Sequence, residues 1–361
     1  MNISEKAKGI IDSCRFCWMC RHICPIGNAT GQERNTARAR ALAVSLVVRG
    51  AEDISSVIDN VYECSLCGAC TNNCVTGWDP KVFVQEVKTD AVMNGVIPQY
   101  ISAMLDKYET TGNAYGEKRC SCLDGLYAEK KADTLFVVGQ DALYKSTESV
   151  KTAAELLKSA GVDFAMNETA DDTGAALWFL TGKTGETTGA AKRAALIMNG
   201  YKTVIVYDPV DLKFIKHEYK EWGIEVTAKV VGFNEELIAL TESGKLKVKN
   251  SGNEYTLQDN YAYARDLEDT ESGRKLISFA GKNKEMLLIG KEANLAGSLL
   301  MNEYMPDVQK RVAEDRWLNA VNMGCKTVVT ENPAEYELLK SVCPDGCRVV
   351  TVEQMITENL L

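Results

Sequence analysis

The chain has 361 residues, a net charge of −9 and a hydrophobic content of 45%. This length predicts two or three domains, and the acidic balance argues against nucleic acid as the main partner. No apolar run reaches the ~18 residues that predict a membrane span, and the first residues lack the pattern of a secretory signal. Thirteen cysteines without such a signal predict reduced thiols in the cytoplasm.

Two matching runs of cysteines stand in the first part of the chain. They are Cys14-x2-Cys17-x2-Cys20-x3-Cys24 and Cys64-x2-Cys67-x2-Cys70-x3-Cys74. In bacterial two-cluster ferredoxins this spacing gives the first three thiolates of a run to one cluster and the fourth to the other. We therefore expect two [4Fe–4S] clusters with crossed ligands. The first cluster takes Cys14, Cys17, Cys20 and Cys74, and the second takes Cys64, Cys67, Cys70 and Cys24.

Zinc sites and disulfides also use closely spaced cysteines. Zinc prefers two separated pairs that close one tetrahedron, and not four cysteines in one short run. Disulfide frameworks are typical of short secreted chains, whereas this chain is long. The iron–sulfur interpretation is therefore favoured over both.

The long connector between the two runs predicts helices. Residues 33–48 and 82–93 carry apolar side chains at helical spacing. A small sheet ferredoxin would have a shorter connector that is rich in strands. We therefore expect an α-helical ferredoxin domain over residues 1–108, followed by a polar, glycine-rich linker over residues 109–132.

Strands alternate with helices in the rest of the chain, which predicts parallel α/β architecture. Two units are expected, over residues 133–243 and 244–361. The expected strands are 135–139, 162–166, 203–207 and 225–230 in the first unit, and 286–289, 326–330 and 348–352 in the second. Each unit contains an alanine-rich helix, a strand and then a proline, which indicates an internal duplication. The predicted fold class is α+β, with two duplicated parallel-sheet units after the helical ferredoxin domain.

This arrangement resembles a family of iron–sulfur subunits. It is similar to those of heterodisulfide reductase, of anaerobic glycerol-3-phosphate dehydrogenase and of the glycolate and lactate oxidases. The resemblance covers most of the chain and is strongest over residues 10–80, with a further match in the linker at residues 112–116. It implies a cytoplasmic electron-transfer subunit of a hetero-oligomer, in which a separate subunit binds FAD.

The family's α/β units carry Cys-Cys-Gly and Cys-Pro-x-Cys steps, and this sequence departs from them. The corresponding positions read Asp172-Thr173-Gly174, Asp208-Pro209-Val210-Asp211, Leu288-Ile289-Gly290 and Asn332-Pro333-Ala334-Glu335. Glycine and proline hold backbone shape, whereas thiolates hold soft metals. We therefore expect these units to keep the fold, to lack the extra clusters and to serve as a scaffold that docks partners.

The carboxylates Asp172, Asp208 and Asp211 allow two interpretations. Three carboxylates near strand ends could bind a divalent cation. Aspartate is also a favoured residue at helix N-termini, and capping is the favoured interpretation.

Five cysteines lie outside the two runs. Cys120 and Cys122 are too few to hold a cluster, and Cys325 is expected to be a buried core thiol. The spacing of Cys343 and Cys347 is not that of a redox pair, so a turn with free thiols is expected there.

The sequence shows no catalytic group, and three functions are compared. The first is an electron-transfer subunit of a flavin-dependent oxidoreductase that relays single electrons through two clusters. The second is a catalytic reductase with its own site in the α/β units, which the absent Cys-Cys-Gly steps disfavour. The third is a regulatory module that senses oxygen or iron, which the acidic charge balance disfavours. Exposed clusters would also favour a host that lives at low oxygen.

Overall fold

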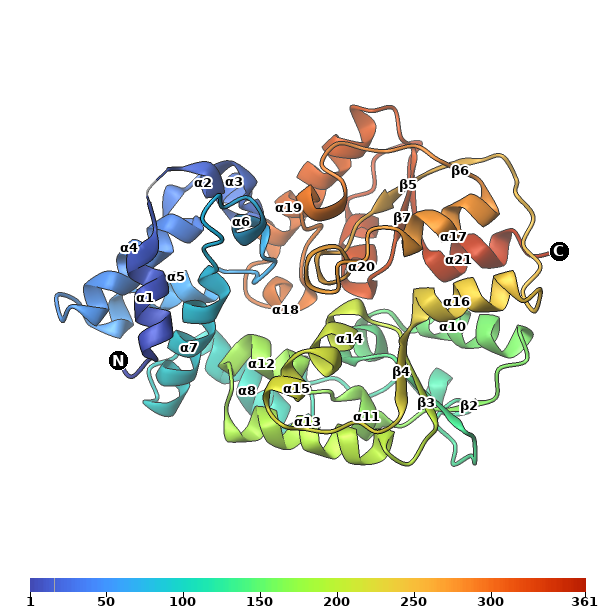
Figure 1. The fold of residues 1–361 in the computed structure, drawn as a ribbon, viewed down its shortest axis with the longest axis horizontal. Coiled ribbons are helices and arrows are strands. Elements are labelled where there is room, and N and C mark those ends of the chain that lie inside the picture. The colour runs from blue at the N-terminus through green and yellow to red at the C-terminus, as the bar shows by residue number, and fades with distance from the viewer. Residues whose placement is uncertain (16) are drawn as a thin grey trace.

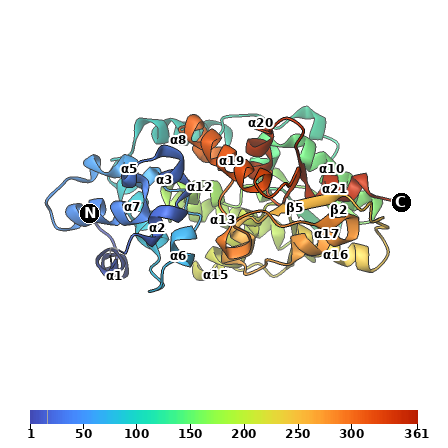
Figure 2. The same ribbon diagram turned by 90° about the horizontal axis from the view of Figure 1, so that it is seen from above.

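The computed structural model describes residues 1–15 and 17–361. A helical amino-terminal region lies beside two α/β units that pack against each other (Figure 1). Seen from above, the helical region occupies one end of the molecule and the carboxyl terminus the other (Figure 2). The mixture of helices with two parallel sheets confirms the predicted fold class.

The amino-terminal region is built from short and medium helices. Its α-helices are α1 (Glu5–Ser13), α2 (Met19–Ile23), α3 (Pro25–Thr30), α4 (Ala37–Val48), α5 (Ile58–Tyr62), α6 (Ala69–Asn72), α7 (Pro80–Met93) and α8 (Gln99–Thr111). Their starts follow local capping chemistry. Thr36 accepts a hydrogen bond from a backbone N–H of α4, and Asp79 does the same for α7, which begins with a proline.

The first α/β unit has a four-stranded sheet of order β2-β1-β3-β4. All of its strand pairs are parallel. Its elements are β1 (Thr134–Val137), α9 (Gln140–Lys145), α10 (Thr147–Ser159), β2 (Phe164–Ala165), α11 (Glu168–Asp171), α12 (Ala175–Thr181), α13 (Gly185–Met198), β3 (Thr203–Val206), α14 (Pro209–Lys216), α15 (Glu218–Glu221), β4 (Lys229–Gly232) and α16 (Phe233–Glu242).

The second unit repeats this topology, with the order β6-β5-β7-β8 and parallel pairs throughout. Its elements are β5 (Glu254–Gln258), α17 (Ser272–Ala280), β6 (Lys282–Asn283), α18 (Leu299–Asn302), α19 (Pro306–Val321), β7 (Thr327–Thr330), α20 (Pro333–Ser341), β8 (Arg348–Thr351) and α21 (Val352–Glu358). The same strand order in consecutive units agrees with an internal duplication.

Two strand predictions in the second unit are wrong. No strand was expected at β5, which reads Glu-Tyr-Thr-Leu-Gln and ends in a buried glutamine. The apolar residues 286–289 were expected to form a strand, and the strand lies earlier, at β6. Leu288 has a φ of 56°, which is outside the β region, and its side chain is exposed. The predicted strand 225–230 also begins too early, since β4 starts at Lys229.

A single buried cluster joins the two α/β units. It contains Phe136 and Ile205 from the first sheet and Leu257 and Val329 from the second. Helix α10 packs against α21, and α16 packs against α17 (Figure 1). The two sheets are therefore held in a fixed relation by shared apolar packing.

The helical region is anchored to both units. Helix α3 packs on α19 of the second unit, and α7 packs on α12 of the first. The Tyr62 hydroxyl donates to the Leu180 carbonyl at 2.9 Å, and the Tyr304 hydroxyl donates to the Tyr62 carbonyl at 2.9 Å. The second cysteine run, which follows Tyr62, is thereby held against the α/β units.

We expect Glu353→Gln to stabilise the protein at alkaline pH. Glu353 is buried between the two units and accepts a hydrogen bond from the Tyr207 hydroxyl at 2.7 Å. Burial raises the pKa of Glu353 to about 7. Because the folded-state pKa lies above the unfolded value, the protonated carboxyl stabilises the fold at acid pH, and this contribution is lost as pH rises from about 4.5 to 7.

Glutamine keeps the hydrogen bond without a titrating proton. Urea titrations at pH 5 and pH 8.5 should show that the variant gains about 1–3 kcal/mol more at the higher pH than at the lower. An equal gain at both values would contradict the assignment. Exposed Glu155 on α10 offers a matched control, since Glu155→Gln should change the stability at neither pH.

Candidate iron–sulfur site

The two cysteine runs fold into the same local structure. In each run a residue with φ of 71° follows the second cysteine, Trp18 in the first and Gly68 in the second. A short helix starts at the next residue, α2 or α6, and these two helices pack against each other. Each helix contains the third cysteine of its run and ends before the fourth, Cys24 or Cys74.

A cavity of about 120 Å³ lies between the two runs. The cysteines that line it are Cys14, Cys17 and Cys20 from the first run and Cys70 and Cys74 from the second. The structure therefore brings the last cysteine of the second run beside the first three of the first run. This is the neighbourhood that crossed ligation of the first cluster requires.

Cys24, Cys64 and Cys67, together with Cys70, form a second, more enclosed group. Burial raises the pKa of Cys24 to about 12; the nearby Arg40 lowers it, and the thiols of Cys67 and Cys64 raise it further. Burial also raises the pKa of Cys70, with contributions from Cys67, Cys64 and Cys24. The fourth cysteine of the first run is thus close to the first three of the second run.

Both groups have the donor chemistry of an iron–sulfur site. Thiolates are the soft ligands that iron–sulfur clusters use. Among residues 1–15 and 17–361, no group of three or more His, Cys, Asp and Glu side chains is arranged to hold a single metal ion. Thiols gathered around a cavity, without convergence on one point, fit a cluster of several irons better than a lone ion.

Two buried cations lie on the side of the second group, and sequence analysis identified neither. Lys88 on α7 is fully buried, and its ammonium group donates to the Phe179 carbonyl at 2.7 Å. Burial lowers the pKa of Lys88 to about 7, whereas the Cys64 side chain raises it. The Arg40 guanidinium is also buried and donates to the Asn60 carbonyl at 2.7 Å. Both would compensate negative charge on thiolates.

The first group lies nearer the surface. Cys17 is exposed, and Trp18 and Met19 beside it are 42% and 49% exposed. The guanidinium groups of Arg38 and Arg21 lie 3.8 Å and 5.7 Å from the centre of the Trp18 ring. A left-handed backbone is unfavourable for tryptophan, and the second run has glycine at this position.

The three carboxylates of the first α/β unit behave differently from one another. Asp208 caps α14, as expected, and accepts a backbone N–H at 2.7 Å. Asp172 and Asp211 do not cap helices, so the capping prediction is wrong for them. They accept hydrogen bonds from tyrosine and threonine hydroxyls, respectively. The absence of a metal-holding group among the described residues also gives no support to a divalent metal site here.

In the second α/β unit, the residues at the corresponding position, at the start of α20, form a polar hydrogen-bond network. Asn332 caps α20 and accepts the Glu335 backbone N–H at 3.0 Å. The buried Glu335 carboxyl accepts from the side-chain amides of Gln258 and Asn260 at 3.0 and 3.1 Å. Amide and carboxyl groups therefore occupy the place where the resembling subunits carry thiols.

The remaining cysteines lie apart from both groups. Cys325 is buried in the core, as predicted. Cys343 and Cys347 are half-buried free thiols. Cys120 and Cys122 in the linker form a disulfide, which differs from the reduced state that the composition predicted.

Comparisons with known proteins agree with the cysteine geometry. Residues 10–78 match the family described as 4Fe-4S dicluster domain. A curated relative, one of the subunits of the dihydromethanophenazine:CoB–CoM heterodisulfide reductase from Methanosarcina mazei, is 24% identical over 180 residues. The match covers 43% of this chain and 43% of that relative, so less than half of the relative's length is spanned.

A solved structure shares the fold at low sequence identity. It is a hypothetical protein from Helicobacter pylori, with a TM-score of 0.52 and 11% identity, and the match covers 99% of this chain and 73% of that chain. Among the helices of the described residues, none is long and apolar enough to cross a membrane.

Proposed function

We propose that this chain, an iron–sulfur protein similar to part of a heterodisulfide reductase, is an electron-transfer subunit of a flavin-dependent oxidoreductase. The two cysteine groups would each hold one [4Fe–4S] cluster with crossed ligands. When bound, such clusters exchange single electrons at potentials that the protein environment sets. Cys70 carries the proposal, because it lines the cavity of the first group and also lies among the thiols of the second. Two clusters that lie next to each other would be suited to pass single electrons from one to the other.

The difference in exposure supports different positions for the two groups in that relay. The first group borders the surface through Cys17, whereas Cys67 of the second group is only 7% exposed. A partner would therefore exchange electrons through the first group. The second group would connect it to the interior, where the α/β units begin.

The partners belong to the same proposal. FAD would be bound by a separate subunit of a cytoplasmic hetero-oligomer that can include further redox subunits, and this chain would have no catalytic residue of its own. The relative in Methanosarcina mazei is itself described as a subunit, which supports a multi-subunit setting. A low-oxygen host would suit a cluster with an exposed ligand.

We expect Cys17→Ala to remove one cluster signal and to stop electron transfer. Cys17 is exposed, so the substitution should leave the fold and the partner contacts in place. Iron content, EPR of the reduced protein and electron flow through the purified complex would measure the effect. Cys343→Ala removes a thiol outside both runs and should change none of the three. Electron flow that continued unchanged in the Cys17 variant would contradict the proposal.

A second candidate is a reductase with its own site in the α/β units. It is favoured by a cavity at the strand ends that is bordered by Ser65 and Leu66 of the second cysteine run. The purified full chain, given a reductant and a panel of disulfides, tests this candidate. Turnover without a partner would support it over the electron-transfer role.

A further inference from the structure

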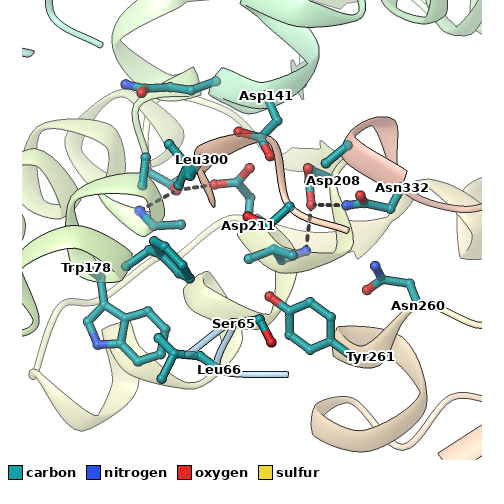
Figure 3. A pocket seen from close by; sticks show the side chains of 18 of the residues that line it. Ser65, Leu66, Asp141, Trp178, Asp208, Asp211, Asn260, Tyr261, Leu300 and Asn332 are labelled. Atoms are coloured by element: carbon teal, nitrogen blue, oxygen red, sulfur yellow. Dashed lines mark hydrogen bonds between the residues drawn. The ribbon is translucent and has the colours of Figure 1, made fainter. Parts of the chain in front are cut away.

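The cavity between the two α/β units is placed where parallel sheets bind ligands. In the first sheet the strand order changes direction between the neighbouring strands β1 and β3. In the second sheet it changes direction between β5 and β7. Ligands of open parallel sheets bind at the carboxyl ends of such strand pairs. The residues that follow these four strands and line the cavity are Gln140, Asp141, Asp208, Asn260, Tyr261 and Asn332. Figure 3 labels all of them except Gln140.

The second cysteine run closes one wall of this cavity. Ser65 and Leu66 line it, and they stand between two cysteines of the enclosed group, Cys64 and Cys67. Ser65 is only 6% exposed, and its hydroxyl has no hydrogen-bond partner among the described residues. The Tyr261 hydroxyl at the same cavity also has none in the described chain. A buried polar group normally has a partner, so the Ser65 hydroxyl indicates a missing one.

Five aspartates line the cavity, and Asp171 and Asp172 have both carboxyl oxygens hydrogen-bonded. Asp141, Asp208 and Asp211 each leave one oxygen without a donor from the described residues. In each of these three aspartates the other oxygen, Oδ1, accepts a hydrogen bond. Asp208 Oδ1 accepts from the Asn332 amide at 3.1 Å, and Asp141 Oδ1 accepts from the Tyr115 hydroxyl at 2.5 Å. Asp211 Oδ1 accepts from a threonine hydroxyl. The second oxygen of each carboxyl remains available to a ligand (Figure 3).

The charge of the lining selects the kind of ligand. Among the described residues that line the cavity there is no lysine, arginine or histidine. Helix N-termini also face it: Asp208 and Asn332 cap α14 and α20, whereas α9 and α12 begin after the glycines Gly139 and Gly174 and have no side-chain cap. Burial, followed by repulsion from Asp211 and Asp141, raises the pKa of Asp208. A cation would remove that repulsion, whereas an anion would add to it.

We propose that this cavity binds a small organic cation, a primary alkylammonium whose N–H groups donate to the free oxygen of Asp208 and to that of one neighbouring carboxyl, Asp141 or Asp211. A metal ion is the less suitable occupant, because no set of three metal-ligating side chains converges within the described residues. The cavity volume is about 70 Å³, room for about five waters or a comparably small ligand. Leu66, Leu300 and Trp178 supply apolar wall for an alkyl chain.

The test uses the full, cluster-loaded chain under anaerobic conditions. Calorimetry with n-propylammonium, 1-propanol and propionate compares a cation, a neutral molecule and an anion of nearly equal size. We expect saturable binding of propylammonium only. Propylammonium should also shift the EPR signal of the enclosed cluster, because Ser65 and Leu66 stand between its ligands.

Substitutions of the cavity residues test whether propylammonium binds at these carboxyl and hydroxyl groups. Asp208→Asn should weaken propylammonium binding at least ~10-fold, and Ser65→Ala, which leaves the carboxyls intact, should weaken it by a smaller factor. Asp133→Asn, at the exposed amino end of the same sheet, should leave binding unchanged. Preferential binding of propionate, equal binding of propanol, or no binding of any probe would each overturn the proposal. None of these readings depends on electron transfer to a partner.

Discussion

Replacing Cys14 and Cys74 together with alanine should leave about half of the iron in the protein, because both residues belong to one cluster in the crossed arrangement. Replacing Cys74 and Cys64 together should remove nearly all of it. The reason lies in the cavity between the runs, where Cys74 lies beside Cys14 and away from its own run's first cysteine. Alanine is the suitable replacement, since a serine oxygen could still bind iron.

The two double variants remove the same number of thiols, so each controls for the other. Iron and acid-labile sulfide per chain, measured after anaerobic purification, would separate them. The single variant Cys74→Ala should match the Cys14 and Cys74 pair. If each run instead held its own cluster, the Cys74 and Cys64 pair would keep about half of the iron, and crossed ligation would be wrong.

Lys88→Met should lower the reduction potential of the enclosed cluster. Lys88 is fully buried on α7, and the influence of Cys64 on its pKa places it near the second group of thiols. Reduction adds a negative charge to a cluster, and a nearby buried cation favours that step. At an effective dielectric constant of about 20 the interaction is about 1–2 kcal/mol, which corresponds to a shift on the order of 50 mV for one electron.

A redox titration followed by EPR measures the shift in the signal of the enclosed cluster. Lys88→Arg keeps the positive charge and should hold the potential close to its original value. Lys158→Met removes an exposed lysine from α10 and should have no effect. An unchanged potential in Lys88→Met, with the cluster still present, would show that this ammonium does not act on the cluster.

More of the candidate site than of the surrounding fold could be predicted from the sequence. Cluster ligands follow a local spacing, so both cysteine runs were visible in the sequence, and the cavity brings Cys74 to the first run. The charge of Lys88 was visible too, but its burial arises only when α7 packs on α12. Such contacts between distant segments leave no signal in a single sequence.

The second sheet shows the same limit. Residues 286–289 are apolar, as a buried strand would be, yet Leu287 and Leu288 are exposed in an irregular segment. Strand β5 was missed because it ends in Gln258, whose buried amide is satisfied by the Glu335 carboxyl 77 positions away. Asp211 was expected to cap a helix and instead faces a cavity that only the packing of both units creates.

The iron and acid-labile sulfide content of the anaerobically purified chain, together with EPR of its reduced form, tests the central claim most directly. Two clusters predict about eight irons per chain and two interacting signals. About four irons would mean that one cysteine group holds no cluster, which would contradict a relay within this chain. A count well above eight would place a further cluster in the α/β units, whose free cysteines among the described residues are Cys325, Cys343 and Cys347.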